Sequence, residues 1–194
     1  MSEQRWLVVG LGNPEAEYGA TRHNVGADAL RVLSQRHRTS LSRNKRVRAE
    51  VAETVIAGDR VVLALPTCWM NESGGPVQSA AKWYDVAADR LIVIHDDLDL
   101  EIGTIRCKQG GGHAGHNGLR DIDRALGSRD YHRVRVGIGR PPGRQPGKDY
   151  VLRRFPPRDR ELVDVALQHA ADCVETIVTQ GIAVAQNVHN GTVG

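Results

Sequence analysis

Two runs of consecutive apolar residues, each followed directly by polar residues, constrain the fold of this 194-residue chain most strongly. The run LVVGL at residues 7–11 leads into Gly12 and Asn13, and the run LIVI at residues 91–94 leads into His95-Asp96-Asp97. Short runs that are apolar at nearly every position are typical of strands buried on both faces of a sheet. The sequence therefore predicts buried strands that carry polar residues at their carboxyl ends.

Helical and strand-like patterns alternate along the rest of the chain. Residues 47–56 and 60–65 flank Gly58-Asp59 and predict a hairpin, and residues 102–108 and 134–138 predict two further strands. The pattern also predicts helices that begin at Thr21 as N-cap and at Gly74, that span residues 119–126, and that follow Pro156-Pro157. Because no repeat or Ser/Gly linker interrupts the alternation, we expect an α/β fold, with a single domain over residues 1–194 and a twisted mixed β-sheet flanked by helices.

Composition argues against several classes of protein. Cys68, Cys107 and Cys173 are odd in number and form no CxxC pair, which argues against a disulfide framework and a zinc knuckle. No basic leader precedes a long apolar stretch, and no span of about 18 apolar residues occurs. We therefore expect a cytoplasmic protein that does not associate with membranes.

Basic residues gather in two stretches of the chain. Residues 106–154 hold ten arginines and two lysines against four aspartates, and residues 31–48 hold seven basic residues and no acid. Either stretch alone is typical of a solvated helix face. The two together indicate a polyanionic partner.

The segment Gly110-Gly111-Gly112-His113-Ala114-Gly115-His116-Asn117-Gly118 stands between a predicted strand and a predicted helix. Glycine permits backbone angles closed to other residues, and amide N–H groups at a helix start attract negative charge. This segment is interpreted either as a ligand-binding loop, with Asn117 at the edge of the ligand, or as a flexible surface loop.

The segment after the first strand begins like a dinucleotide-binding fingerprint and then departs from it. Glu15 occupies the position of the third glycine, and Pro14 lacks the N–H group that a pyrophosphate would use. Nucleotide binding is therefore not expected. Asn13 either caps a turn or faces a ligand.

Polar residues at strand ends could form a hydrolytic site. Asp96 could hold the imidazole of His23 in one tautomer, leaving its other nitrogen to take a proton from water, although a lone histidine is more often structural. Asp96, Asp97 and Asp99 could instead bind a metal ion. No HExxH or GxSxG motif occurs, and Cys68 has no basic partner. Neutral amides that could bind carbonyl groups and water follow three predicted strands: Asn13, Asn71 and Asn117.

Several motifs occur together along the chain: Gly10-Leu11-Gly12-Asn13-Pro14, Tyr18, Thr21-Arg22-His23-Asn24, Met70-Asn71 with Ser73-Gly74, His95-Asp96-Asp97-Leu98-Asp99, residues 110–119, Arg135-Val136-Gly137-Ile138-Gly139 and Asp149-Tyr150-Val151-Leu152. In this order they resemble the bacterial-type peptidyl-tRNA hydrolases over nearly the whole chain. The resemblance implies a monomeric α/β enzyme without cofactor or metal. Such an enzyme cleaves the ester between a peptide and the 3′-terminal ribose of tRNA, so its partners are peptidyl-tRNA and tRNA.

The resemblance also assigns roles by position. It implies that His23 is the general base, that Asp96 orients it, and that Asn13 discriminates N-blocked from free aminoacyl-tRNA. Asn117 would hold the water or the developing oxyanion. The remaining positions imply contacts to the substrate by Tyr18, Trp69, Met70, Asn71, Asn117 and His116, and a clamp for the tRNA 5′-phosphate formed by Lys108 and Arg135.

Glu15 and Trp69 depart from the family pattern, which commonly has glycine and Phe or Tyr at these positions. Glu15 puts the geometry of its loop in doubt, whereas Trp69 preserves an aromatic surface. Two alternatives stay open at this point. One is a non-catalytic RNA-binding module of the same fold, since the fold resembles a chloroplast group II intron splicing factor, and the other is a metal-dependent hydrolase.

Overall fold

Within residues 4–192, which the computed structural model describes, the strands form one mixed sheet in the order β2-β3-β4-β1-β5-β7-β6-β8. Strands β4, β1, β5 and β7 at its centre run parallel, and the outer strands pair antiparallel. The strands are β1 (Arg5–Gly10), β2 (Ser42–Asn44), β3 (Ala49–Ile56), β4 (Asp59–Pro66), β5 (Leu91–Asp97), β6 (Thr104–Gln109), β7 (His132–Gly137) and β8 (Gly191–Thr192).

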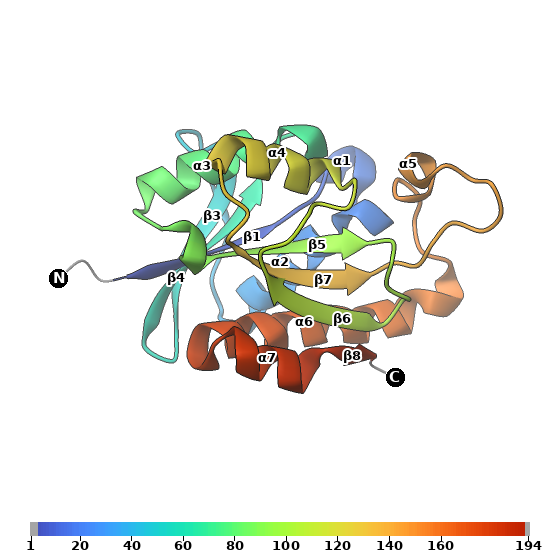
Figure 1. Ribbon diagram of the computed structural model, residues 1–194. Coiled ribbons are helices and arrows are strands. Elements are labelled where there is room, and N and C mark those ends of the chain that lie inside the picture. The colour runs from blue at the N-terminus through green and yellow to red at the C-terminus, as the bar shows by residue number, and fades with distance from the viewer. Residues whose placement is uncertain (1–3, 193–194) are drawn as a thin grey trace.

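Helices cover both faces of this sheet, with α3 and α4 over one face and α6 and α7 over the other (Figure 1). The α-helices are α1 (Glu15–Tyr18), α2 (Val25–Arg36), α3 (Gly74–Trp83), α4 (Asn117–Leu126), α5 (Gly147–Tyr150), α6 (Arg160–Gln180) and α7 (Ile182–His189). The described residues also form four short 3₁₀ turns: η1 (Arg22–Asn24), η2 (Met70–Glu72), η3 (Ala88–Arg90) and η4 (Pro157–Asp159). None of the described helices is long and apolar enough to cross a membrane.

The apolar strands are buried on both faces, as predicted. Val8 of β1 packs into the core that α2 and α6 share, whereas its neighbours Leu7 and Val9 pack into the core under α3 and α4. Since successive side chains of a strand point to opposite faces, a strand between two helical layers has to be apolar at every position. The predicted α/β fold with a mixed sheet flanked by helices is confirmed.

The local predictions were correct where a pattern was strong. The hairpin of β3 and β4, with Gly58 at a φ of 94° in its turn, and the long helix after Pro157 are both present. The predicted N-cap at Thr21 is wrong, because its hydroxyl donates to the carbonyl oxygen of Tyr18 (2.7 Å) and caps no helix. A 3₁₀ turn follows instead, and α2 begins at Val25.

Parallel pairing brings several loops to one edge of the sheet. The carboxyl ends of β1, β4, β5 and β7 all lie there, and ligands bind in the crevice at such an edge in open α/β sheets. Gly26 lets α2 approach closely, because a Cβ atom on it would lie 2.2 Å from the carbonyl oxygen of Ile94. This close approach places η1, just before α2, beside the end of β5.

Candidate active site

A histidine and an aspartate from these two elements form a buried pair. His23 of η1 is held by its backbone N–H, which donates to the carbonyl oxygen of Val151 (2.8 Å), and its Nδ1 lies 2.8 Å from Asp96 Oδ2 at the end of β5. Both residues are buried, and both line a cavity of about 380 Å³. Because a carboxylate only accepts hydrogen bonds, Nδ1 carries the proton. Nε2 is therefore left with a lone pair that can accept a proton from water.

A second histidine binds the other oxygen of the same carboxylate. His116 Nε2 lies 2.7 Å from Asp96 Oδ1, while its Nδ1 accepts hydrogen bonds from the N–H groups of Gly118 (3.1 Å) and Leu119 (3.3 Å). His116 is thus the N-cap of α4 and donates through Nε2. The family resemblance implied only a substrate contact for His116, whereas the structure makes it a direct partner of Asp96.

Burial and charge set the protonation of this cluster. Burial opposes a charge on Asp96, but His23 and His116 outweigh it and hold the pKa of the carboxyl well below its usual range. Burial also opposes a charge on His23, but the charge and hydrogen bond of Asp96 raise its pKa above 6.5. Burial and the neighbouring His116 lower the pKa of His95 to about 3, so His95 is neutral and donates from Nδ1 to the carbonyl oxygen of Asp96 (2.8 Å).

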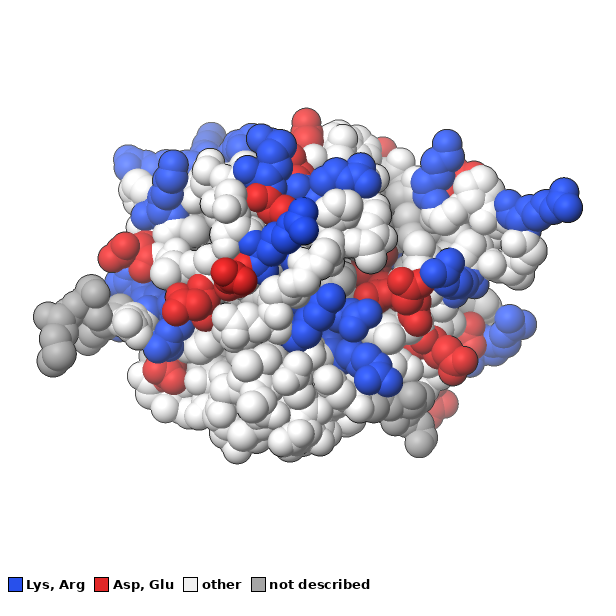
Figure 2. Space-filling view, viewed as in Figure 1, with Lys and Arg blue, Asp and Glu red and all other residues white. Residues whose placement is uncertain are grey.

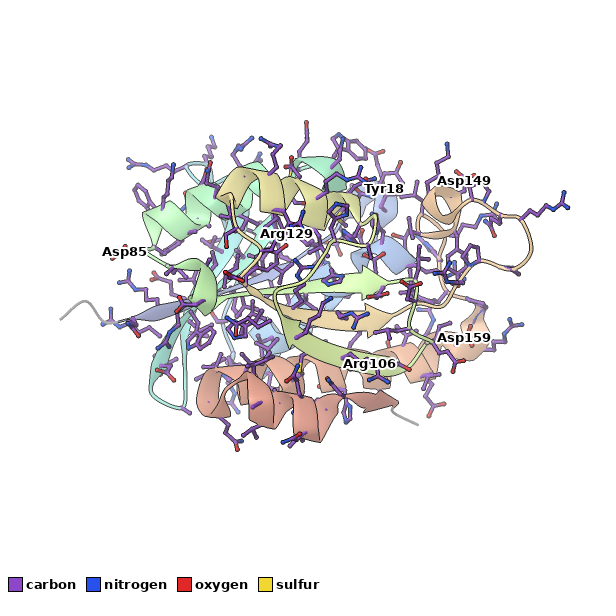
Figure 3. All side chains as sticks on the ribbon, viewed as in Figure 1. Tyr18, Asp85, Arg106, Arg129, Asp149 and Asp159 are labelled. Carbon is purple, nitrogen blue, oxygen red and sulfur yellow. The ribbon has the colours of Figure 1, made fainter. Side chains whose placement is uncertain are left out.

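The cavity above this cluster is bounded by three segments distant in sequence. These are the end of β5 with the residues after it, the second half of the glycine loop (the segment from Gly110 to His116), and the region around α5. Figure 3 shows Tyr18 and Asp149 at the end of the molecule where β5 also ends. The cavity is lined by His23, His95, Asp96, Asp97, Leu98, Asp99, His113, Ala114, Gly115, His116, Asn117, Arg140, Gly147, Lys148 and Val151.

The amide of Asn13 is fixed by its neighbours. Its Oδ1 accepts a hydrogen bond from the N–H of Met70 (2.8 Å), which links the loop after β1 to η2. Asn24 binds the backbone of Asn13 twice, accepting from its N–H (2.8 Å) and donating to its carbonyl oxygen (2.9 Å). The orientation of Asn13 therefore leaves its Nδ2 as the donor for a ligand. Sequence reasoning did not predict that Asn24 holds the backbone of Asn13, although Asn24 follows His23 directly in the same motif.

The other predicted substrate residues lie on the α4 side of the cleft. Met70 is buried against α4, since a Cβ atom on Gly118 would lie 2.7 Å from its Sδ. The rings of Tyr18 and Trp69 meet edge to face at 5.6 Å, and Trp69 is 43% exposed. Asn71 shares a second depression with Asn117, which also lines the main cavity. Asn117 therefore lies where the main cavity and the second depression meet.

Lys108 and Arg135 lie outside the cavity, on neighbouring strands. Lys108 of β6 pairs in register with Arg133 of β7, so Lys108, Arg133 and Arg135 share one face of the sheet. Figure 2 shows basic side chains gathered over β6 and β7, with acidic ones beside them. Arg135 Nε donates to Asp97 Oδ2 (2.8 Å). Burial and the charges of Arg135 and Arg133 lower the pKa of Lys108.

The cluster has the side chains of a metal site but not the protonation that one requires. His23, Asp96 and His116 bring three possible ligand atoms within 4.8 Å of one another. A metal ion on His116 Nε2 would move the imidazole proton to Nδ1, where two backbone N–H groups already donate. The other possible metal site, formed by Asp96, Asp97 and Asp99, fits a metal ion no better. Two of its carboxylates are already in ion pairs, Asp97 with Arg135 and Asp99 with Arg140.

Fold and cleft together define a hydrolytic enzyme of the α/β class. A family profile described as Peptidyl-tRNA hydrolase matches residues 7–193. The chain belongs to the peptidyl-tRNA hydrolase family.

Individual relatives agree with this assignment. The chain is 53% identical over 182 residues to a peptidyl-tRNA hydrolase of Frankia casuarinae, covering 94% of this chain and 92% of the relative. It is 51% identical over 181 residues to that of Mycobacterium tuberculosis, covering 93% and 95%. The crystal structure of peptidyl-tRNA hydrolase from Acinetobacter baumannii superimposes with a TM-score of 0.91 at 36% identity, covering 99% of this chain and 97% of the other.

Proposed function

We propose that this chain hydrolyses the ester bond between the peptide and the 3′-terminal ribose of peptidyl-tRNA, releasing free tRNA and peptide, with His23 as general base. One observation carries this proposal. His23 Nδ1 is committed to Asp96 Oδ2 (2.8 Å), on a buried carboxylate, and the histidine lines the cavity. A histidine held in this way is oriented to take a proton through Nε2.

The proposed reaction needs one base and no covalent intermediate. Nε2 of His23 removes a proton from water while the water oxygen attacks the ester carbonyl carbon, and the imidazolium then returns the proton to the departing 3′-oxygen. Asp96 orients the ring and stabilises the imidazolium. An ester has a better leaving group than an amide, so direct attack by water suffices when donors stabilise the oxyanion.

The amides take the remaining roles in this proposal. Asn117 holds the water or the oxyanion, since it lines both depressions at the start of α4. Asn13 offers Nδ2 to the peptide and thereby discriminates N-blocked substrates, and Asn71 binds the peptide beyond Asn117. Met70, Tyr18 and Trp69 supply apolar and aromatic surface on the same side, and His116 holds Asp96.

Lys108 of β6 and Arg135 of β7 bind the tRNA in this proposal. Arg135 keeps Nε on Asp97, which leaves its two Nη groups for a phosphate, and Lys108 adds a second cation on the neighbouring strand. No metal or cofactor takes part. That the chain acts as one domain and as a monomer stays a prediction.

The buried pair favours an enzyme over the non-catalytic RNA-binding module, which needs no oriented base. Purified protein should hydrolyse N-acetyl-aminoacyl-tRNA at the same rate with and without EDTA. Binding of this substrate without hydrolysis would support the RNA-binding module instead. Loss of hydrolysis in EDTA would support the metal-dependent hydrolase.

A further inference from the structure

Arg133 is a buried cation that no step of the proposed reaction uses. Its neighbours on the same face, Lys108 and Arg135, are partly exposed, whereas Arg133 is only 1% exposed. A guanidinium group withdrawn from water needs several partners to offset its lost hydration. Its partners therefore show what the residue does.

Those partners are the glycine loop and α4. Arg133 Nη1 donates to the carbonyl oxygen of Gly112 (2.6 Å), and Nη2 donates to that of Gly111 (2.8 Å). Nη2 also lies 3.6 Å from Oδ1 of Asp123 on α4, and the guanidinium carbon lies 4.7 Å from the ring centroid of Tyr131. Tyr131 in turn donates its hydroxyl to Asp123 (2.6 Å). One planar side chain thus joins β7, α4 and two successive carbonyls of the loop.

The glycine loop needs such an anchor because, after Gly110, whose N–H donates to the carbonyl oxygen of Tyr131 (3.0 Å), its backbone lies outside the strands of the sheet. Gly110, Gly111 and Gly115 have φ values of 72°, 100° and 80°, which lie in the left-handed region that favours glycine. A chain with this freedom adopts many conformations unless side chains hold it. The last residue of the loop is His116, which binds Asp96. It is followed by Asn117, the first residue of α4, which lines the cavity.

We propose that Arg133 is a positioning residue for hydrolysis: by holding the carbonyl groups of Gly111 and Gly112, it keeps His116 and Asn117 in their places at the cleft. This inference rests on the proposed function. A lysine cannot replace the arginine, because one ammonium group does not present two parallel donors in a fixed plane. The role concerns the rate of the chemical step rather than the binding of tRNA.

The test is hydrolysis of a short substrate, an N-acetyl-aminoacyl ester of the 3′-terminal nucleotides, which does not reach Lys108 and Arg135. In R133A we expect kcat to fall on the order of 10- to 100-fold with a smaller change in KM, because small displacements of reacting groups have effects of this size. Guanidinium ion, at concentrations far below those that denature, should restore part of kcat by refilling the site. Methylammonium should not.

Arg106 offers the matched control. It lies on β6 on the same face, opposite Arg135, and is exposed, and Figure 3 shows it at the outer part of β6, away from α4. R106A should keep the kcat of the wild type on the short substrate. If R133A does not fold, R133K takes its place and should also lose kcat, with shifted NMR signals of the Asn117 side-chain amide.

Two outcomes would overturn the inference. One is a kcat of R133A or R133K equal to that of the wild type. The other is a loss of activity that matches the loss of folded protein, without rescue by guanidinium and without a change at Asn117. If the wild type hydrolyses neither the short ester nor N-acetyl-aminoacyl-tRNA, the proposed function fails instead, so the two failures are distinguishable.

Discussion

Two histidine–carboxylate pairs of nearly equal length lie in different parts of this molecule. His23 Nδ1 is 2.8 Å from Asp96 Oδ2, and His37 Nε2 is 2.7 Å from Glu175 Oε1 where the end of α2 meets α6. The side chains of the first pair are 11% and 3% exposed, and those of the second 21% and 26%. Distance alone therefore does not distinguish the pair that we propose as catalytic from the second pair.

The difference lies in what surrounds each pair. The second oxygen of Asp96 accepts a hydrogen bond from His116 Nε2 (2.7 Å), whereas the second oxygen of Glu175 accepts one from Arg36 Nη1 (3.0 Å). His23 also lines a cavity of about 380 Å³. Burial, a carboxylate that binds two histidines and contact with a cavity make the first pair suitable for proton transfer, whereas the second pair joins two helices.

Replacing the two histidines by alanine tests this comparison most directly. H23A should lower kcat for N-acetyl-aminoacyl-tRNA on the order of 10² to 10⁴-fold, because general-base catalysis contributes that much. Binding of tRNA should be nearly unchanged, since His23 holds no phosphate. H37A, the matched control, should keep wild-type turnover. Near-normal turnover of H23A would remove His23 from the role of base.

Changing the carboxylates tests the electrostatic part of the comparison. D96N should slow hydrolysis on the order of 10- to 100-fold, because the ring of His23 remains but loses its orienting charge. Since Asp96 raises the pKa of His23, activity of the wild type should fall as the pH is lowered through a value above 6.5. In D96N this acid limb should move to lower pH. A flat profile from about pH 5 to 8, with chemistry limiting, would contradict a histidine base.

Strong local patterns explain why much of the fold could be predicted. The runs before Gly10 and His95 are apolar at nearly every position, so β1 and β5 followed from the pattern, and parallel pairing then placed Asn13 and Asp96 at one edge. By contrast, β8 is only two residues long, and its pairing with β6 depends on tertiary structure. The sequence analysis also did not predict α7, which begins directly after Gly181.

The pairing of His23 with Asp96 could be predicted from the sequence, whereas several contacts around it could not. His23 and Asp96 were matched from the chemistry of their types, but the bond between Asp96 and His116 depends on the path of a loop with positive φ at Ala114 (48°) and Gly115. The burial of Arg133 could not be predicted from the sequence either. Alternation along β7 places Arg133 and Arg135 on one face, and only the loop above them decides which one is covered.

Asn13 extends the comparison from proton transfer to selectivity. N13A should lower hydrolysis of N-acetyl-aminoacyl-tRNA by about 1–3 kcal/mol of transition-state stabilisation, and free aminoacyl-tRNA much less, because a hydrogen bond to the blocked peptide is lost. N13D separates its two functions, since it keeps an oxygen for the N–H of Met70 but loses the Nδ2 donor. Equal losses on both substrates in N13D would assign Asn13 to the architecture of the loop.

The cations outside the cleft should affect binding rather than chemistry. Replacing Lys108 and Arg135 together by alanine should weaken binding of full-length peptidyl-tRNA and reduce the slope of log affinity against log salt by up to about two units. Hydrolysis of the short ester should be unchanged, because it does not reach these residues. If the rates on both lengths fall equally at two salt concentrations, the cations are not a phosphate clamp.

The surface pair should show the smallest effect, and on stability rather than activity. E175Q removes the charge beside His37 and Arg36, but Arg36 keeps its hydrogen bonds to Asp172 (2.6 Å) and Gln168 (2.7 Å). Exposed ion pairs contribute about 0–1 kcal/mol, so the free energy of unfolding, measured by urea denaturation, should fall by no more than that. Because Glu175 supports no reacting group, kcat should not change. A loss of turnover in E175Q as large as in D96N would show that the second pair also acts on the reaction, and the distinction drawn from burial and access would fail.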